Sequence, residues 1–335
     1  MAGVSRPDPR PGRVCVPVAT VWTSPTAPRD VDADAVRDRP DPGRWASADP
    51  GVRSGLHGRL LTQLLLGEPV LVLEERDGWS RVVAPDQPSA ADRRGYPGWV
   101  RSVHLAGEVG TRPAATSRAC VTSRTATCRL ADGGHLTLSF GTRLPVAEVA
   151  GAVVSLRLPD GGRGEVSSAD LAVTAEDRPA SFSGADLLAD AAVFLGLRYL
   201  WGGTSGWGVD CSGLVHLVLR RYGVPLPRDA CDQASTALVQ DVALDAVRPG
   251  DLYFFAAPGE RVSHVGFASR PVAEDGTRWM LHAPETGEVV EDTALPAQRL
   301  GTLVSAARVL PPRASVTGCG TPPDWPPSSP RGSRR

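Results

Sequence analysis

The stretch GVDCSGLVHLVLRRYG, residues 208–223, decides how the C-terminal half of this chain folds. Between residues 212 and 222 the apolar positions fall on nearly every side of a helix, which is typical of a helix buried in a core. Gly223 is suited to end that helix, and Pro225 prevents its continuation. The stretch therefore predicts a buried helix over 212–222, with Cys211 at its first turn.

Cys211 has the position of a catalytic nucleophile. The unpaired N–H groups and the positive end of the helix dipole favour a thiolate, so we expect a lowered thiol pKa. His264 and His282 lie on predicted strands, over 263–269 and 278–282, and antiparallel pairing would bring the two imidazoles together. One imidazole would then act as a base toward Cys211 and the other would orient it. Taken alone, three such residues are more often a core cysteine and two structural histidines.

The sequence around Cys211 predicts an α+β unit. A helix is expected to begin near Ser183 and to end at Gly196, ahead of the Cys211 helix. The strands follow, over 251–255 and then over the two histidine segments. Helices first and a sheet later make an α+β arrangement.

Several short motifs follow one another in this region. They are 199–203 (YLWGG), 210–214 (DCSGL), 227–229 (PRD), Gln233, 249–252 (PGDL) and 263–266 (SHVG). Together they closely resemble the NlpC/p60 family of papain-like cysteine peptidases, over about residues 183–309. The resemblance implies a papain-like catalytic domain that cleaves the peptide stems of bacterial cell walls and needs no metal or other cofactor. It implies these roles: Cys211 as nucleophile, His264 as general base, His282 as the orienting residue and Tyr199 at the oxyanion site.

The N-terminal half reads as an all-β repeat. Short apolar alternations separated by Gly and Pro over 69–105 recur in the same order over 143–171. Each copy resembles a bacterial SH3-like barrel, although Glu165 stands where the second copy should have Trp. Such barrels either bind ligands or act as spacers. The predicted parts are a disordered N-terminus (1–13), a first barrel (14–106) with an inserted loop at about 29–56, a divergent second barrel (107–175), the peptidase domain (180–311) and a disordered tail (312–335).

The order barrel, barrel, peptidase resembles γ-D-glutamyl-L-diamino acid endopeptidases, which act on stem peptides with a free N-terminal L-Ala. The first barrel is then expected to close the amino-terminal side of the cleft. The resemblance assigns the substrate ammonium to Asp229, although Ala230 stands where some members have Ser. It adds these residues to the substrate site: Tyr96 from the barrel, Ser212 for the D-Glu carboxylate (or as a helix cap), Glu68 as a second carboxylate (or a solvent-exposed turn residue) and Asp210.

Three alternatives stay open at this point. The enzyme could act on intact peptidoglycan with its barrels as wall anchors, or use the same residues as an amidase or acyltransferase. It could also be a wall-binding protein without catalysis. The sequence leaves open whether the third stem residue is meso-diaminopimelate or Lys, and in what oligomeric state the protein acts.

The composition argues against nucleic acid as a partner and against a membrane span. With 36 basic against 37 acidic residues and a net charge of −1, the chain lacks the excess positive charge that nucleic acid binding needs. No run approaches the roughly 18 apolar residues of a membrane span. The N-terminus shows no secretory signal, so we expect a cytoplasmic protein, or a secreted one if the true start lies elsewhere.

The remaining cysteines and histidines are not expected to take part in catalysis. The cysteines are too sparse for a disulfide scaffold, and no spacing suggests a metal site. Cys120 and Cys128 fall in one barrel, but nothing in their spacing demands a bridge. We expect His216 and Cys231 to be packed side chains, and Cys319 to be exposed in the tail.

Overall fold

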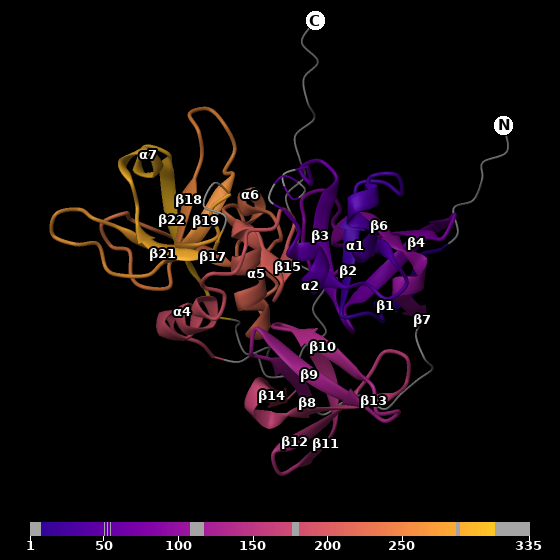
Figure 1. Ribbon diagram of the computed structural model, residues 1–335. Coiled ribbons are helices and arrows are strands. Elements are labelled where there is room, and N and C mark those ends of the chain that lie inside the picture. Colours follow the sequence, from indigo (N-terminus) through magenta and orange to yellow (C-terminus); the bar gives the residue numbers. More distant parts are fainter. Residues whose placement is uncertain are drawn as a thin grey trace, which may run out of the picture.

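The computed structural model describes residues 8–49, 51, 53, 55–107, 117–175, 181–285 and 289–311. The predicted tail, with Cys319, lies outside the described residues. Two barrels and a peptidase lobe lie against one another (Figure 1). None of the helices in the described part of the chain is long and apolar enough to cross a membrane.

The first barrel is a seven-stranded sheet. Its strands are β1 (Arg10–Val14), β2 (Val18–Trp22), β3 (Leu60–Leu65), β4 (Pro69–Arg76), β5 (Trp79–Ala84), β6 (Tyr96–Arg101) and β7 (Leu105–Gly107). They are arranged in the order β3-β2-β6-β5-β4-β1-β7. The expected disorder is wrong for residues 10–13, because β1 pairs with both β4 and β7 and buries Val14. Ladder hydrogen bonds fix this strand although its Arg/Pro-rich composition resembles a tail.

The insertion between β2 and β3 is folded. It contains η1 (Asp30–Asp32), α1 (Ala33–Val36) and α2 (Pro42–Ala46). The fully buried carboxylate of Asp32 accepts hydrogen bonds from Arg29 and from the indole N–H of Trp45. Trp45 in turn packs against Trp22 of β2, with ring centroids 6.2 Å apart. The predicted insertion is thus present, but as short helical turns over the barrel.

The second barrel repeats the first. Its strands are β8 (Ser117–Val121), β9 (Thr125–Leu130), β10 (His135–Ser139), β11 (Arg143–Ala150), β12 (Val153–Arg157), β13 (Arg163–Ser167) and β14 (Leu171–Ala175). Their order, β10-β9-β13-β12-β11-β8-β14, matches that of the first barrel strand for strand. This confirms the predicted internal repeat. Cys120 and Cys128 are both buried here as free thiols.

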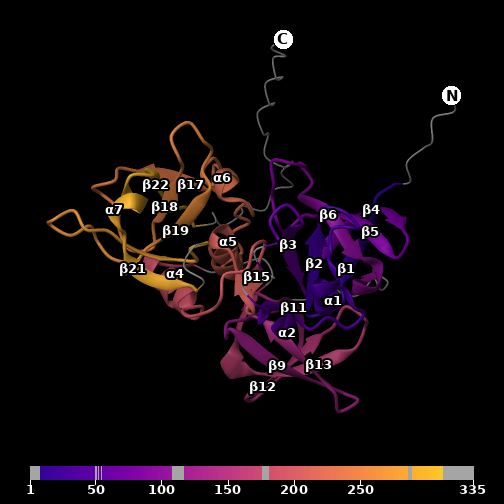
Figure 2. The same cartoon turned by 45° about the horizontal axis from the view of Figure 1, so that its top comes forward.

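The peptidase lobe places helices against an antiparallel sheet (Figure 2). Its helices are α4 (Gly184–Ala192), α5 (Cys211–Arg221), α6 (Ala230–Gln233) and α7 (Ala297–Leu300). The sheet runs β17-β22-β18-β19-β20-β21, with β17 (Val239–Val242), β18 (Leu252–Phe255), β19 (His264–Ala268), β20 (Trp279–His282), β21 (Glu291–Ala294) and β22 (Leu303–Val309). A two-stranded ribbon, β15 (Thr204–Ser205) and β16 (Gly208–Val209), precedes α5.

The predicted start of α4 and the predicted extent of α5 are confirmed, whereas α4 ends at Ala192, ahead of the predicted end at Gly196. Ser183 caps α4, its hydroxyl accepting from the N–H of Asp186 in a reciprocal capping box. Tyr222 ends α5, and Gly223 follows with φ of +73°, a conformation that favours glycine. Ten of the eleven residues of α5 are buried, as the all-round apolar pattern predicts.

Both barrels contribute to the peptidase core. Val18 and Leu65 of the first barrel and Phe140, next to β10 of the second, belong to the same buried cluster as α5. Phe140 packs edge-on against Phe194, with ring centroids 5.1 Å apart. Because these apolar side chains cross the domain boundaries, the barrels are packed units of one structure.

Candidate active site

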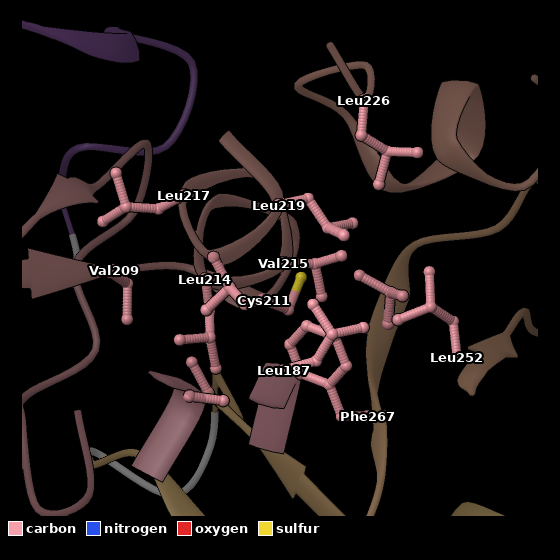
Figure 3. Close-up of a cluster of buried hydrophobic side chains, with 14 of the residues drawn as sticks. Leu187, Val209, Cys211, Leu214, Val215, Leu217, Leu219, Leu226, Leu252 and Phe267 are labelled. Carbon is pink, nitrogen blue, oxygen red and sulfur yellow. The ribbon is translucent and has the colours of Figure 1, made fainter. Parts of the chain in front are cut away.

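The N-terminus of α5 places the thiol. Asp210 precedes the helix in an extended conformation, and its carboxylate caps the helix by accepting the N–H of Gly213 at 2.7 Å. Gly213 is required, since a Cβ there would lie 2.1 Å from the carbonyl oxygen of Gly203. Cys211 is therefore the first residue of a buried helix (Figure 3) and is 8% exposed.

The thiol of Cys211 does not have the lowered pKa that the sequence predicted. Burial, and then the charge of Asp210, raise the pKa of Cys211 to about 12. The backbone N–H groups of Val265 and Ser212 favour the thiolate, but burial outweighs them. The prediction counted the helix terminus and omitted the loss of water around the sulfur. A base must therefore take the thiol proton when the nucleophile reacts.

The two predicted histidines meet. Strands β19 and β20 pair antiparallel, and Nε2 of His264 lies 2.8 Å from Nδ1 of His282. Gly266 permits this approach, because a Cβ there would lie 2.6 Å from Cβ of His282. Since His282 occupies Nε2 of His264, Nδ1 is the nitrogen that His264 has available for a thiol.

His264 is the first residue of β19, the strand against which α5 packs. Helix α5 packs against β19, and Sγ of Cys211 lies 3.9 Å from the carbonyl oxygen of Ser263, the residue before His264. Burial, the neighbouring His282 and then Arg299 lower the pKa of His264 well below its ordinary value. Burial and then Arg299 lower the pKa of His282 to about 3. Both imidazoles are therefore neutral at physiological pH, as a general base must be.

Tyr199 lies beside the thiol. Its backbone forms a bridge with Val209, just before the Cys211 helix, and its phenol experiences the charges of Asp210 and Cys211. Burial, and then those charges, raise the pKa of Tyr199, which keeps the hydroxyl protonated and able to donate. Arg53 of the barrel insertion donates to the carbonyl oxygen of Tyr199 at 2.7 Å.

Arg228 is a site residue to which sequence reasoning gave no role. Its guanidinium is fully buried and binds both carboxylate oxygens of Asp210, at 3.0 and 2.7 Å, and the hydroxyl of Ser212 at 3.0 Å. Its Nε donates to Thr62 of the first barrel at 2.9 Å. Its position next to Asp229, in the motif at 227–229, was the sequence feature that could have indicated a role for Arg228 in the site.

This network defines the roles of Asp210 and Ser212. The carboxylate of Asp210 accepts from the N–H groups of Gly202 and Gly213 as well as from Arg228, so its oxygens are occupied within the protein. Asp210, not Ser212, is the helix cap, which excludes capping as the role of Ser212. Both side chains are buried beside the thiol.

Asp229 and Tyr96 come together across the domain boundary. The phenol of Tyr96, on β6 of the first barrel, lies 3.1 Å from each carboxylate oxygen of Asp229. Burial raises the pKa of Asp229, although Arg228 and Tyr96 favour its ionised form. Burial and then Asp229 raise the pKa of Tyr96, so the phenol donates the hydrogen bond.

Glu68 does not belong to this site. Its carboxylate is fully buried, and Arg220 lies 2.8 Å from it. It also accepts from Gln87 at 2.9 Å and from the N–H of Leu65. Neither a substrate carboxylate nor a solvent-exposed turn residue describes it, because its oxygens are held in the interface between barrel and peptidase.

The other predicted structural residues are packed. The imidazole of His216 is buried, with Nδ1 2.7 Å from the carbonyl oxygen of Leu226. Cys231 is half-buried and lies 3.2 Å from Arg261. Among the residues that the structure describes, no three His, Cys, Asp or Glu side chains gather as metal ligands would.

A thiol at a helix N-terminus, with a histidine pair on the adjacent strands, defines the site of a papain-like cysteine peptidase. The sequence profile of the NlpC/P60 family matches residues 196–304, and that of the bacterial dipeptidyl-peptidase Sh3 domain matches residues 52–105. The chain belongs to the NlpC/P60 family.

Relatives match across both barrels and the peptidase domain. A γ-D-glutamyl-L-lysine dipeptidyl-peptidase of Bacillus subtilis is 34% identical over 281 residues, covering 82% of this chain and 90% of its own. A protein of the same name from Bacillus cereus is 29% identical, covering 82% and 84%. The crystal structure of an NlpC/P60 family protein from Bacillus cereus superposes with a TM-score of 0.82 at 28% identity, covering 90% of this chain and all of that one.

Proposed function

We propose that this enzyme cleaves the γ-D-glutamyl–diamino acid bond of cell-wall stem peptides whose N-terminal L-Ala is free. The observation that carries the proposal is the contact between Tyr96 and Asp229, because it joins the first barrel to a carboxylate near the nucleophile. The names of the Bacillus relatives point to the same bond.

The proposed reaction is acyl transfer through Cys211. The sulfur attacks the γ-carbonyl of D-Glu while Nδ1 of His264 takes the thiol proton. The oxyanion is stabilised by the phenol of Tyr199 and by the N–H of Cys211. His264 then donates its proton to the leaving amine, and a thioester forms as the C–N bond breaks. Water, deprotonated by His264, hydrolyses the thioester and returns the enzyme.

Asp229 is proposed to bind the ammonium of L-Ala. Burial raises the pKa of Asp229, which means that its charge lacks full compensation in the free enzyme. An ammonium supplies a positive charge and hydrogen-bond donors to the carboxylate. An acetylated amine has no charge, and its acetyl group adds bulk in the cleft. The barrel that carries Tyr96 then limits the cleft on the amino-terminal side.

The test compares L-Ala-γ-D-Glu-L-Lys with its N-acetylated form, by mass spectrometry of the products. We expect acetylation to lower kcat/KM about 30- to 1000-fold, from the loss of a charge-assisted hydrogen bond and an unpaired carboxylate. Asp229→Asn should impair the free-amine substrate strongly and the acetylated one little. Equal cleavage of both substrates, with Asp229→Asn harmless to each, would refute the proposal.

Two further arms extend this test. Intact peptidoglycan distinguishes a wall-lytic enzyme, which would release fragments from it, from one limited to free peptides. The meso-diaminopimelate peptide determines which third residue is preferred.

A cytoplasmic location is also proposed, and fractionation of cells that express the untagged protein tests it.

A further inference from the structure

The histidine pair has a neighbour on the next strand. Strand β21 pairs antiparallel with β20, in a register that sets Glu291 directly opposite His282. Oε1 of Glu291 lies 3.5 Å from Nε2 of His282, the ring nitrogen that His264 does not use. The Glu291 side chain is 38% exposed, while that of His282 is buried.

The geometry determines where the protons must lie. For Nδ1 of His264 to accept the thiol proton, the neutral ring must carry its hydrogen on Nε2. That hydrogen points at Nδ1 of His282, 2.8 Å away, which must therefore be an acceptor. A neutral His282 with an acceptor at Nδ1 carries its own hydrogen on Nε2, where it faces the Glu291 carboxylate.

We propose that Glu291 is a positioning residue, which holds the proton of His282 on Nε2 and thereby fixes the tautomer of His264. The proposal rests on the proposed role of His264 as the base. When His264 takes the thiol proton, the positive charge is shared along the pair, and the Glu291 carboxylate stabilises it. Contacts of this kind are often long in a free enzyme and shorten when the charge develops.

Other charged groups also act on the pair. Arg299 of α7 opposes a positive charge on either ring, and the thiol of Cys211 lies 3.9 Å from the carbonyl oxygen of Ser263, the residue before His264. Glu291 therefore offsets Arg299 while the imidazolium exists. Because His264 must be neutral to act as a base, the acid limb of the pH profile of kcat reports the pKa of the imidazolium. Removing the carboxylate should lower that pKa, so the acid limb should move to lower pH.

The experiment uses Glu291→Gln and Glu291→Ala in the full chain. The matched control is Glu274→Gln, which removes an exposed carboxylate from the β19–β20 connection of the same sheet. With L-Ala-γ-D-Glu-L-Lys, we expect kcat to fall about two- to fivefold in Glu291→Gln with KM unchanged. The loss should be larger in Glu291→Ala, and the acid limb should move only in the two Glu291 variants.

A second measurement needs no substrate. Nitrogen NMR of ¹⁵N-histidine-labelled protein reports the tautomer of each ring, and His282→Gln assigns the His282 signals. We expect wild-type His282 protonated on Nε2 and a tautomer mixture in Glu291→Ala, with Glu274→Gln unchanged. A wild-type His282 protonated on Nδ1 would overturn the inference, as would Glu291 variants that match the control in tautomer and pH profile. If the peptide is not cleaved at all, the proposed function fails while the NMR result still decides the role of Glu291.

Discussion

Replacing Arg228 with Met should destabilise the protein severely and disable the site. The substitution removes the hydrogen bonds to Thr62 and Ser212 and both contacts with Asp210, while the unbranched side chain keeps much of the volume. It leaves the Asp210 carboxylate buried with backbone N–H donors but without its cation. Breaking a buried ion pair by removing one partner costs about 3–5 kcal/mol of unfolding free energy.

Arg228→Lys separates charge from geometry. Lysine keeps the cation but cannot make the fork that binds both oxygens of Asp210 and reaches Thr62 as well. We expect it to lose about 1.5–3 kcal/mol, the range for hydrogen bonds to a charged group. Because Asp210 caps α5, both variants should also lower kcat by moving the helix terminus that carries Cys211.

The assay is urea unfolding followed by far-ultraviolet circular dichroism and tryptophan fluorescence, with coincident transitions as the check on cooperativity. Arg308→Met is the matched control. Arg308 makes an equally close pair with Asp251, 2.7 Å at both oxygens, but its side chain is 38% exposed. The control should lose clearly less stability, since water replaces part of its contact. Arg228→Met within about 1 kcal/mol of wild type, or no more destabilised than the control, would refute the reasoning.

Three other predictions concern the thiol and the imidazoles. Cys211→Ala should abolish hydrolysis while the melting temperature stays close to that of wild type, and turnover by the folded variant would exclude the proposed nucleophile. His282→Gln should retain more activity than His264→Ala, because an orienting side chain can be mimicked by an amide and a base cannot; the reverse order in folded variants would exchange the two roles. Burial lowers the pKa of His216 and of His282 to about 3, so the unfolded chain binds their protons first and the unfolding free energy should fall as pH drops from about 6.5 toward 3. His216→Asn keeps a donor for the Leu226 carbonyl and should flatten that slope in urea titrations at successive pH values.

Local pattern was enough for the elements that carry the site. The apolar run after Cys211 predicted α5, and Gly223 marked its end. Alternation along β19 and β20 was enough to place His264 and His282 in reach of each other. These features depend on residues a few positions apart in the sequence, or on the pairing of two successive strands. Both can therefore be predicted from local sequence patterns.

Contacts between segments that are far apart in the sequence could not be predicted from local patterns. Glu68 looked like a turn carboxylate, but its partner Arg220 comes from a helix of another domain. The raised pKa of Cys211 has the same origin, because the burial that causes it is produced by packing of the whole lobe. A helix terminus can be predicted from a sequence, whereas the extent to which the folded protein excludes water from that terminus cannot.

The interface between the first barrel and the peptidase lobe argues against a spacer role for that barrel. The segment after α5 is held from the barrel side by the carbonyl oxygen of Pro88, which accepts the N–H of Arg228, and by the N–H of Ala90, which donates to Asp232. Between these two points lies Asp229, in contact with Tyr96. The same segment thus carries the cation that holds the nucleophile helix and the carboxylate proposed to select the substrate. We therefore expect a change in how the barrel docks to alter both the proposed selectivity and the position of Cys211, which is the coupling expected when a binding surface and a catalytic site share one buried polar network.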